Sequence, residues 1–205
     1  MSIQVTTVRP GAVLADVLPA SSAGRAQVRD AALVLGGAAL TGVAAQLAVP
    51  VPGSPVLVTG QTFAALLVGA SLGARRGFLS MALYVLAGVA GVPWFTEASS
   101  GAAMPSFGYL LGMLLAATVV GALARRGGDR GMVRTAGTMA VGMALTYGVG
   151  VPYLALATGM SAGEAISAGL VPFLVGDALK AALAMGALPA AWKLLGDRDR
   201  GLDRD

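Results

Sequence analysis

The sequence predicts an all-α integral membrane protein with six transmembrane helices and both termini in the cytoplasm. The first observation is composition: 56% of the 205 residues are hydrophobic and only 12% are charged. The mean hydropathy of +0.77 is far above that of water-soluble domains. The second is that six apolar runs recur along the chain, and the third is that the basic residues gather beside alternate runs. A chain of this length has no room for a separate soluble domain.

The six apolar runs set the expected domain boundaries. They cover residues 31–49, 56–74, 78–92, 109–124, 132–158 and 168–195. A stretch with three prolines, residues 50–55, ends the first run because proline interrupts a helix. We therefore expect a cytoplasmic N-terminal tail over residues 1–30, a six-helix membrane domain over residues 31–195 and a cytoplasmic C-terminal tail over residues 196–205. The first 30 residues lack the apolar core and cleavage site of a signal peptide.

The basic residues predict the orientation. Thirteen of the fourteen fall on one side: eleven lie in the two tails or in the connections after the second and fourth runs, and Arg134 and Lys193 lie at the adjoining ends of the fifth and sixth runs. The alternate loops at residues 50–55, 93–107 and 159–167 contain no lysine or arginine. By the positive-inside rule, both termini lie in the cytoplasm and these three loops lie outside.

Composition also excludes several classes of function. The chain contains no cysteine and no histidine, which removes disulfides, thiolate and imidazole catalysis, and metal sites built on those ligands. The net charge of +4 reflects topology rather than nucleic-acid binding, because few aromatic residues are available to stack on bases. We expect no enzyme activity, no metal and no cofactor.

One intramembrane pair calls for an explanation. Asp177 and Lys180 are three residues apart in the sixth run, so they share a helix face and can pair. An ionised residue at a helix centre costs roughly 2.5 to 3.5 kcal/mol on insertion scales. The pair is either a structural bridge between helices or part of a binding site for a ligand with an anionic group and N–H donors.

Polar and aromatic residues near the outer loops are further binding candidates. Thr59, Gln61 and Thr62 stand at the start of the second run, where they either cap the helix or face a ligand. Trp94 and Phe95 lie in the second outer loop, residues 93–107, and Tyr109 follows it, where aromatic residues are either interface anchors or pocket walls.

The first run is rich in small residues. Gly37, Thr41 and Ala45 form one row and Ala38 and Gly42 an adjacent pair, which allow another helix to approach closely. That helix belongs either to the same bundle or to a partner protein.

Five motifs follow one another along the chain: residues 50–56 leading into 59–62, 73–77 followed by Tyr84, 91–95, 108–112 and 172–180. Together and in this order they resemble the BioY family, the biotin-specific substrate-binding (S) components of energy-coupling factor (ECF) transporters. The resemblance implies the ECF S-component fold in the bacterial cytoplasmic membrane and high-affinity capture of biotin from outside. It also implies partners: a transmembrane coupling protein and two ATP-binding cassette (ABC) ATPase subunits.

The resemblance also assigns roles to residues. It implies that Asp177 and Lys180 contact biotin, together with Gln61 and its threonine neighbours, Tyr84 and the aromatic residues near the loops. Ser100 lies in the loop after the third helix, where this sequence departs from the glycine-rich or asparagine-containing segment of many relatives. The small residues Gly37, Ala38, Thr41, Gly42 and Ala45 are expected to dock the coupling protein.

Three alternatives stay open at this point. The chain could be an S component for another small vitamin, because one fold accepts different pockets. It could be an intramembrane enzyme, with a Ser–Lys dyad using Lys180 as the one available arrangement. It could also be a membrane subunit without a ligand, which tight binding by the purified protein would exclude.

Overall fold

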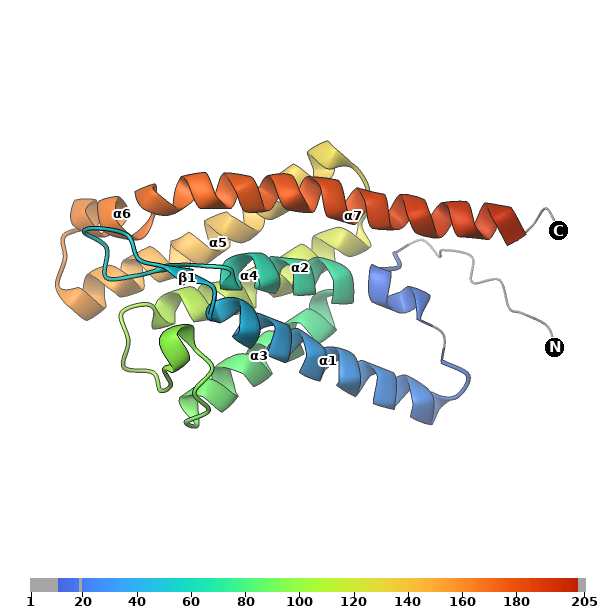
Figure 1. Cartoon of the computed structure of the whole chain (residues 1–205), viewed down its shortest axis with the longest axis horizontal. Coiled ribbons are helices and arrows are strands. Elements are labelled where there is room, and N and C mark those ends of the chain that lie inside the picture. Colours follow the sequence, from blue (N-terminus) through green and yellow to red (C-terminus); the bar gives the residue numbers. More distant parts are fainter. Residues whose placement is uncertain (1–10, 19, 203–205) are drawn as a thin grey trace.

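The protein is a bundle of helices (Figure 1). The structure, a computed structural model, describes residues 11–18 and 20–202. The helices are α1 (Ala23–Ala45), α2 (Gln61–Leu72), α3 (Ala74–Val89), α4 (Phe107–Arg125), α5 (Met132–Thr158), α6 (Ala162–Gly169) and α7 (Leu174–Leu202). Short 3-10 turns are η1 (Leu14–Val17), η2 (Thr96–Ala98) and η3 (Val171–Phe173), and strands β1 (Ala48–Val49) and β2 (Val58–Thr59) pair antiparallel.

Each of the six predicted apolar runs contains all or most of one helix, and an additional helix, α6, lies mostly in the predicted outer loop at residues 159–167. Within the described residues, four segments are long and apolar enough to cross a membrane: α1, α4, α5 and the stretch Ala162–Leu195. Helix α2 is a shorter apolar helix, and α3 covers Ala74–Val89. The prediction of an all-helical membrane protein is therefore supported by the structure, whereas length and composition alone identify four spans.

The first helix begins earlier than predicted. Helix α1 starts at Ala23 rather than at residue 31, because the Ser22 hydroxyl accepts the backbone N–H of Arg25 at 3.3 Å and caps the helix. The expected tail over residues 1–30 therefore contains two turns of α1. It also contains the buried residues Val13 and Ala15, which pack against α2, α4 and α7.

The last predicted run is broken. Residues 168–195 do not form one helix, because α6 ends at Gly169 and α7 begins at Leu174. Pro172 lies in η3 between them, where its missing N–H and its effect on the preceding residue oppose a continuous helix. At the other end, α7 continues to Leu202, so most of the expected C-terminal tail over residues 196–205 is helical.

Small residues bring the helices close together. A side-chain carbon on Gly69 of α2 would meet the backbone of Ala117 on α4, so these two helices pack at backbone distance. Gly73 has a φ of 83° between α2 and α3, a value that favours glycine, and it lets the chain reverse in a single residue.

The small residues of the first helix are used inside the chain. Thr41 donates to the Gly37 carbonyl at 2.9 Å and lies 3.8 Å from the Met81 sulfur of α3, and a side-chain carbon on Gly42 would lie 3.3 Å from the Trp94 ring. The buried positions of this face include all of the expected docking residues: Gly37, Ala38, Thr41, Gly42 and Ala45. These residues pack against α2, α3 and Trp94 within the chain, and docking of the coupling protein on this helix stays a prediction.

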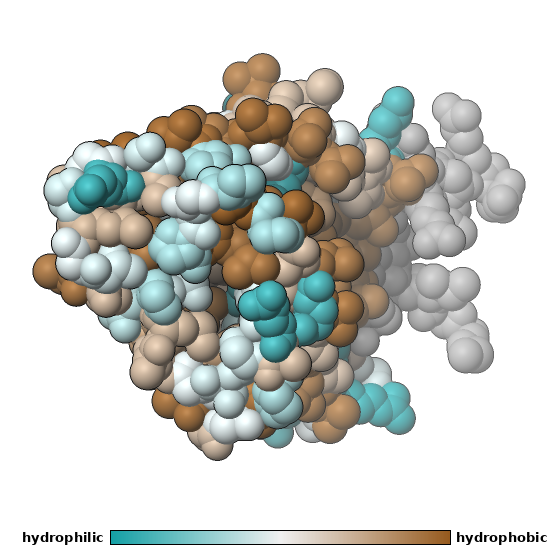
Figure 2. Space-filling view, turned by 60° about the vertical axis from the view of Figure 1, so that its left-hand side comes forward, coloured by the Kyte–Doolittle hydropathy of each residue, from teal (hydrophilic) through white to brown (hydrophobic). Residues whose placement is uncertain are grey.

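The bundle has two distinct ends. The loop end contains α6, the β1–β2 pair and the segment around η2, and the terminal end contains η1 and the C-terminal turns of α7 (Figure 1). In Figure 2 the loop end faces forward, with pale and hydrophilic residues gathered on it and hydrophobic residues toward its edges.

At the terminal end, η1 is held by arginines from other elements. Arg76 of α3 and Arg125 of α4 lie 2.7 and 3.4 Å from the two carboxylate oxygens of Asp16. Burial opposes ionisation of this carboxyl, but the hydrogen bonds from Arg76 and the Val13 N–H and the charges of both arginines outweigh it. They hold the pKa of Asp16 below its usual value.

A second aspartate at this end is fully buried. The indole N–H of Trp192 on α7 donates to Asp129 Oδ2 at 2.6 Å, and the Arg130 guanidinium lies 4.1 Å from the centre of the Trp192 ring. Asp129 Oδ1 has no hydrogen-bond partner among the described residues. Burial raises the pKa of Asp129 more than the Trp192 hydrogen bond and the charge of Arg130 lower it.

Candidate ligand-binding pocket

A pocket opens at the loop end, between the β1–β2 connection, the η2 loop and helices α2, α4 and α5. Its walls combine aromatic and aliphatic side chains with hydroxyls and one amide. The lining residues are Pro55, Val56, Leu57, Thr59, Gln61, Thr62, Phe95, Thr96, Met104, Ser106, Tyr109, Leu110, Met113, Thr146, Tyr147 and Phe173. Apolar walls with a few polar groups are typical of sites for small organic ligands.

One wall is built around Gln61, the first residue of α2. Its side-chain amide is buried and donates to the Tyr84 hydroxyl at 2.8 Å, and that hydroxyl donates to the Trp94 carbonyl at 3.2 Å. The indole N–H of Trp94 donates to the backbone carbonyl of Tyr84 at 3.0 Å. One of the two amide N–H groups of Gln61 is occupied by Tyr84, so its second N–H and its amide oxygen are left for a ligand.

Phe95 is fixed on the same wall. Its ring lies edge-on to Tyr84 with 5.2 Å between centroids, and it fills the space that a side chain on Gly88 would need. Phe95 is 1% exposed, so it is a rigid part of the pocket rather than an anchor at the membrane surface.

The opposite wall contains two tyrosines. Tyr109 of α4 donates its hydroxyl to the Gly169 carbonyl at 2.7 Å and meets the Tyr147 ring edge-on at 6.2 Å. Tyr147 of α5 packs in turn against Phe173 of η3, 6.4 Å between centroids. The break between α6 and α7 therefore supplies both a carbonyl and an aromatic ring to this wall.

Behind Tyr147 lies the charged pair. Tyr147 donates its hydroxyl to Asp177 Oδ2, and the Lys180 ammonium donates to Asp177 Oδ1 at 3.0 Å. Asp177 is 3% exposed and stands in the first turn of α7, where the helix dipole favours a carboxylate. The Lys180 side chain is 14% exposed. The pair reaches the pocket through the Tyr147 hydroxyl.

The η2 loop is tied to the end of α1 by one side chain. Gln46 donates to the carbonyls of Trp94 and Phe95 at 3.1 and 3.0 Å and accepts the Ala98 N–H at 3.2 Å. Glu97 and Ala98 have φ values of 58° and 53°, a region that non-glycine residues rarely adopt. The Gln46 amide thus ties the loop that contributes Phe95 and Thr96 to the pocket to the end of α1.

Comparison with known families agrees with this architecture. The model of the BioY family matches residues 18–197. The chain belongs to the BioY family. A relative from Pyrococcus horikoshii named probable biotin transporter BioY is 35% identical over 78% of this chain and 93% of its own length. The biotin transporter BioY of Thermotoga maritima is also 35% identical, over 66% of this chain and 80% of its own length.

A solved structure shares the fold. It is the crystal structure of the S-component for biotin from an ECF-type ABC transporter, with a TM-score of 0.75 and 20% sequence identity. The superposition covers 85% of this chain and 95% of that one. The resemblance to BioY drawn from the sequence motifs is therefore confirmed, as is the S-component fold.

The predicted site residues fall into three groups in this BioY protein. Five line the pocket: Thr59, Gln61, Thr62, Phe95 and Tyr109. Four stand behind the lining, with Tyr84 and Trp94 supporting Gln61 and the pair of Asp177 and Lys180 supporting Tyr147. Ser100 is exposed and does not line the pocket, because the η2 loop turns Phe95 and Thr96 inward instead.

Sequence reasoning missed part of the wall, above all Tyr147. The missed lining residues include Thr96, Met104, Ser106, Met113, Thr146, Tyr147 and Phe173. A signal was available for two of them, since Thr146 and Tyr147 are adjacent polar groups in the middle of a mostly apolar run.

Proposed function

We propose that this protein captures biotin outside the cell and serves as the S component of an ECF-type transporter in the cytoplasmic membrane. Membership of the BioY family and relatives named biotin transporters support this function. The observation that supports it most directly is the pocket at the loop end, where Tyr147 in the aromatic wall is hydrogen-bonded to the pair of Asp177 and Lys180 behind it.

The pocket offers a partner for each part of biotin. Biotin has a ureido ring with two N–H donors and one acceptor, an apolar thioether ring and chain, and a carboxylate. Carboxylate and amide oxygens, from Asp177 and Gln61, suit the N–H donors, and the Lys180 ammonium and the hydroxyls of Thr59 and Thr62 suit an anion. Phe95, Tyr109 and Phe173 suit the apolar part.

Calorimetry on detergent-purified protein tests the ligand. Biotin should bind with the highest affinity in a series that continues with thiamine, riboflavin and lipoate. Tighter binding of one of the other vitamins would favour an S component of different specificity. No binding of any of them would favour a membrane subunit without a ligand. The intramembrane enzyme is set aside, since the relatives are named transporters and the structural neighbour is a transporter component.

The proposed topology has six spans, with both termini in the cytoplasm and the loop end outside. The distribution of thirteen of the fourteen basic residues supports it. Because the chain has no cysteine, single cysteines can be introduced at Ser54, Ser100 and Gly163 and probed in intact cells with an impermeant thiol reagent. All three should react, whereas one at Val133, which is 85% exposed at the start of α5, should not. Labelling at Val133 alone would reverse the orientation.

The proposed partners are a transmembrane coupling protein and two ABC ATPase subunits. The family resemblance and the S-component fold support this assembly. Co-expression followed by affinity purification of the S component should recover all of these subunits, and ATP-driven biotin uptake in proteoliposomes should require them. Uptake by the S component alone would contradict the assembly.

A further inference from the structure

A groove runs between α1 and α3 on the side of the bundle, apart from the biotin pocket. It encloses about 550 Å³. One end is polar and holds Asp30, Arg75, Arg76 and Arg125, and the remainder is lined by aliphatic residues of both helices. No contact in the proposed binding site or its supporting network uses this groove.

The polar end has an excess of positive charge. Arg76 is engaged, with Asp16 at 2.7 Å and Asp30 at 3.0 Å, and Arg29 lies 2.9 Å from Asp30. Arg125 lies 3.4 Å from Asp16, and Arg75 is exposed without an ion-pair partner among the described residues. Four guanidinium groups thus surround two carboxylates, which leaves Arg75 and part of Arg125 available to an anion.

The apolar part has the length of one membrane leaflet. Leu79, Ala82, Leu83 and Leu86 form one face of α3, opposite Ala31 and Val34 of α1. From Arg75 to Leu86 the helix rises about 16 Å at about 1.5 Å per residue. That is about half of a hydrocarbon core of about 30 Å. Leu79 and Leu86 are 42% and 67% exposed, so the groove is open toward the bilayer.

We propose that this groove binds one anionic phospholipid of the cytoplasmic leaflet. The phosphate contacts Arg75 and Arg125, and an acyl chain lies along Leu79, Ala82 and Leu86. Basic pockets between helices on the cytoplasmic side suit anionic headgroups, and the charge excess separates this groove from an ordinary lipid-facing surface. The leaflet assignment rests on the proposed orientation with both termini in the cytoplasm.

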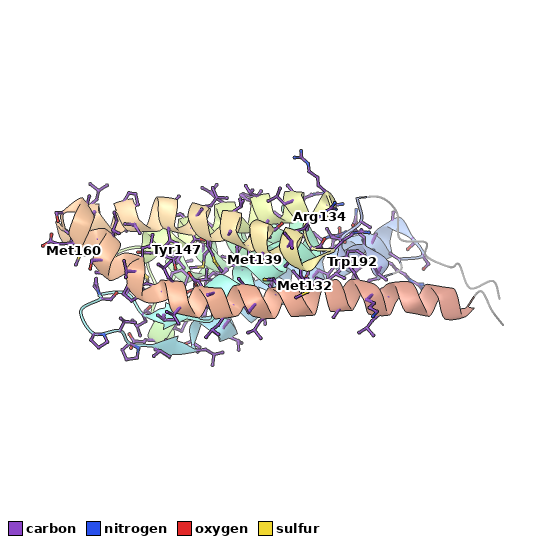
Figure 3. The ribbon with its side chains drawn as sticks, turned by 90° about the horizontal axis from the view of Figure 1, so that it is seen from above. Met132, Arg134, Met139, Tyr147, Met160 and Trp192 are labelled. Carbon is purple, nitrogen blue, oxygen red and sulfur yellow. The ribbon has the colours of Figure 1, made fainter. Side chains whose placement is uncertain are left out.

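Native mass spectrometry of the detergent-purified protein tests the site. With equal amounts of phosphatidylglycerol and phosphatidylcholine added, a single retained phosphatidylglycerol molecule is expected. Arg75→Ala should lower its occupancy about fivefold, the effect of one arginine near a membrane surface. The matched control is Arg134→Ala, which removes the same charge from an exposed residue that points away from the bundle (Figure 3). It should leave the occupancy unchanged.

A second pair of variants tests the apolar part. Ala82→Trp fills the groove and should displace the lipid, whereas Ala140→Trp, on the exposed face of α5, should not. If Ala82→Trp does not fold, the comparison of Arg75→Ala with Arg134→Ala still tests whether the groove binds an anionic lipid. Equal retention of phosphatidylcholine, or equal loss in Arg75→Ala and Arg134→Ala, contradicts the proposal.

Two other occupants have their own signatures. If glycerol 1-phosphate raises the melting temperature as much as phosphatidylglycerol does, the polar end binds a soluble phosphate and the lipid proposal is wrong. If Ala82→Trp abolishes co-purification of the coupling protein while phosphatidylglycerol is retained as in the unmodified chain, the groove is a protein interface. Biotin calorimetry on the same samples reports the proposed function separately, because it does not depend on lipid occupancy.

Discussion

Each end of the molecule contains one buried aspartate, and the two differ in their partners. Asp177 at the loop end is 3% exposed and is held by a tyrosine hydroxyl and a lysine ammonium. Asp129 at the terminal end is fully buried and is held by a neutral indole, with one oxygen lacking a partner among the described residues. In Figure 3 the side chains that hold them, Tyr147 and Trp192, lie toward opposite ends of the bundle.

The difference separates a site that can exchange partners from one that locks segments together. At Asp177 the Tyr147 hydroxyl lies between the charged pair and the pocket, so a ligand that binds there can exchange hydrogen bonds with this group. At Asp129 the indole is fixed on α7, and Arg130 lies over its ring while donating to the Ala12 carbonyl at 3.0 Å. That cluster joins the segment before η1, the α4–α5 loop and α7, which indicates a structural role.

The largest expected effect is on ligand affinity at the loop end. Lys180→Ala should weaken biotin binding by about 2 to 5 kcal/mol, because it removes the cation that is proposed to pair with the carboxylate of biotin. Calorimetry measures this loss, and Lys193→Ala, an exposed lysine on the same helix, is the matched control. If Lys180→Ala binds biotin normally and only loses thermal stability, the pair is a packing bridge.

Removing the hydroxyl between the pair and the pocket should have the next largest effect. Tyr147→Phe keeps the ring against Phe173 and deletes a hydrogen bond to a charged group, for a cost of about 1.5 to 3 kcal/mol in affinity. Tyr153→Phe, a tyrosine of the same helix for which no side-chain hydrogen bond is present within the described residues, is the control. Equal affinities in the two variants would remove Tyr147 from the site.

At the terminal end the expected loss is in stability. Asp129→Ala leaves the buried Trp192 N–H without an acceptor and should cost about 1 to 3 kcal/mol of unfolding free energy. Asp129→Asn retains an acceptor and should cost less. Thermal unfolding in detergent gives both values, while biotin affinity should not change in either variant. A loss of affinity here as large as at Lys180 would abolish the distinction between the two ends.

The smallest effects are in pH dependence, and they have opposite signs. The pKa of Asp129 is higher in the folded protein than its ordinary value of 3.8 in the unfolded chain. Its contribution to stability is therefore present below pH 3.8 and is lost as the pH rises through the pKa of the folded state. The pKa of Asp16 is lower in the folded protein than 3.8. Its contribution to stability is therefore present above pH 3.8 and is lost as the pH falls through the pKa of the folded state. Stability relative to Asp129→Asn should therefore fall with rising pH, and relative to Asp16→Asn it should rise. Parallel curves for the two variants would contradict this.

Local chemistry allowed much of the site to be predicted. Thr59, Gln61 and Thr62 were identifiable because polar groups at the start of an apolar run need a reason to be there, and all three line the pocket. Asp177 and Lys180 were identifiable from the cost of charge in a membrane, and they pair as their spacing predicted.

The features that sequence could not give depend on which helices meet. The row of Gly37, Thr41 and Ala45 predicts a close neighbour, but spacing does not say whether that neighbour is α3 or another protein. Tyr147 contacts Asp177 only because α5 packs beside α7. The two residues are thirty positions apart in the sequence, so spacing alone does not pair them. The extra turns of α1 followed from the Ser22 cap, which a search for apolar runs overlooks.

The side chain of Gln46 is expected to affect the rates of ligand binding and release rather than the affinity. It holds the loop that supplies Phe95 through three hydrogen bonds, and we expect a ligand to enter and leave the pocket past this loop, which requires these bonds to open. Removing these hydrogen bonds by Gln46→Ala should raise the association rate and the dissociation rate of the ligand by similar factors. The equilibrium constant would then change little, and stopped-flow exchange would detect an effect that calorimetry does not.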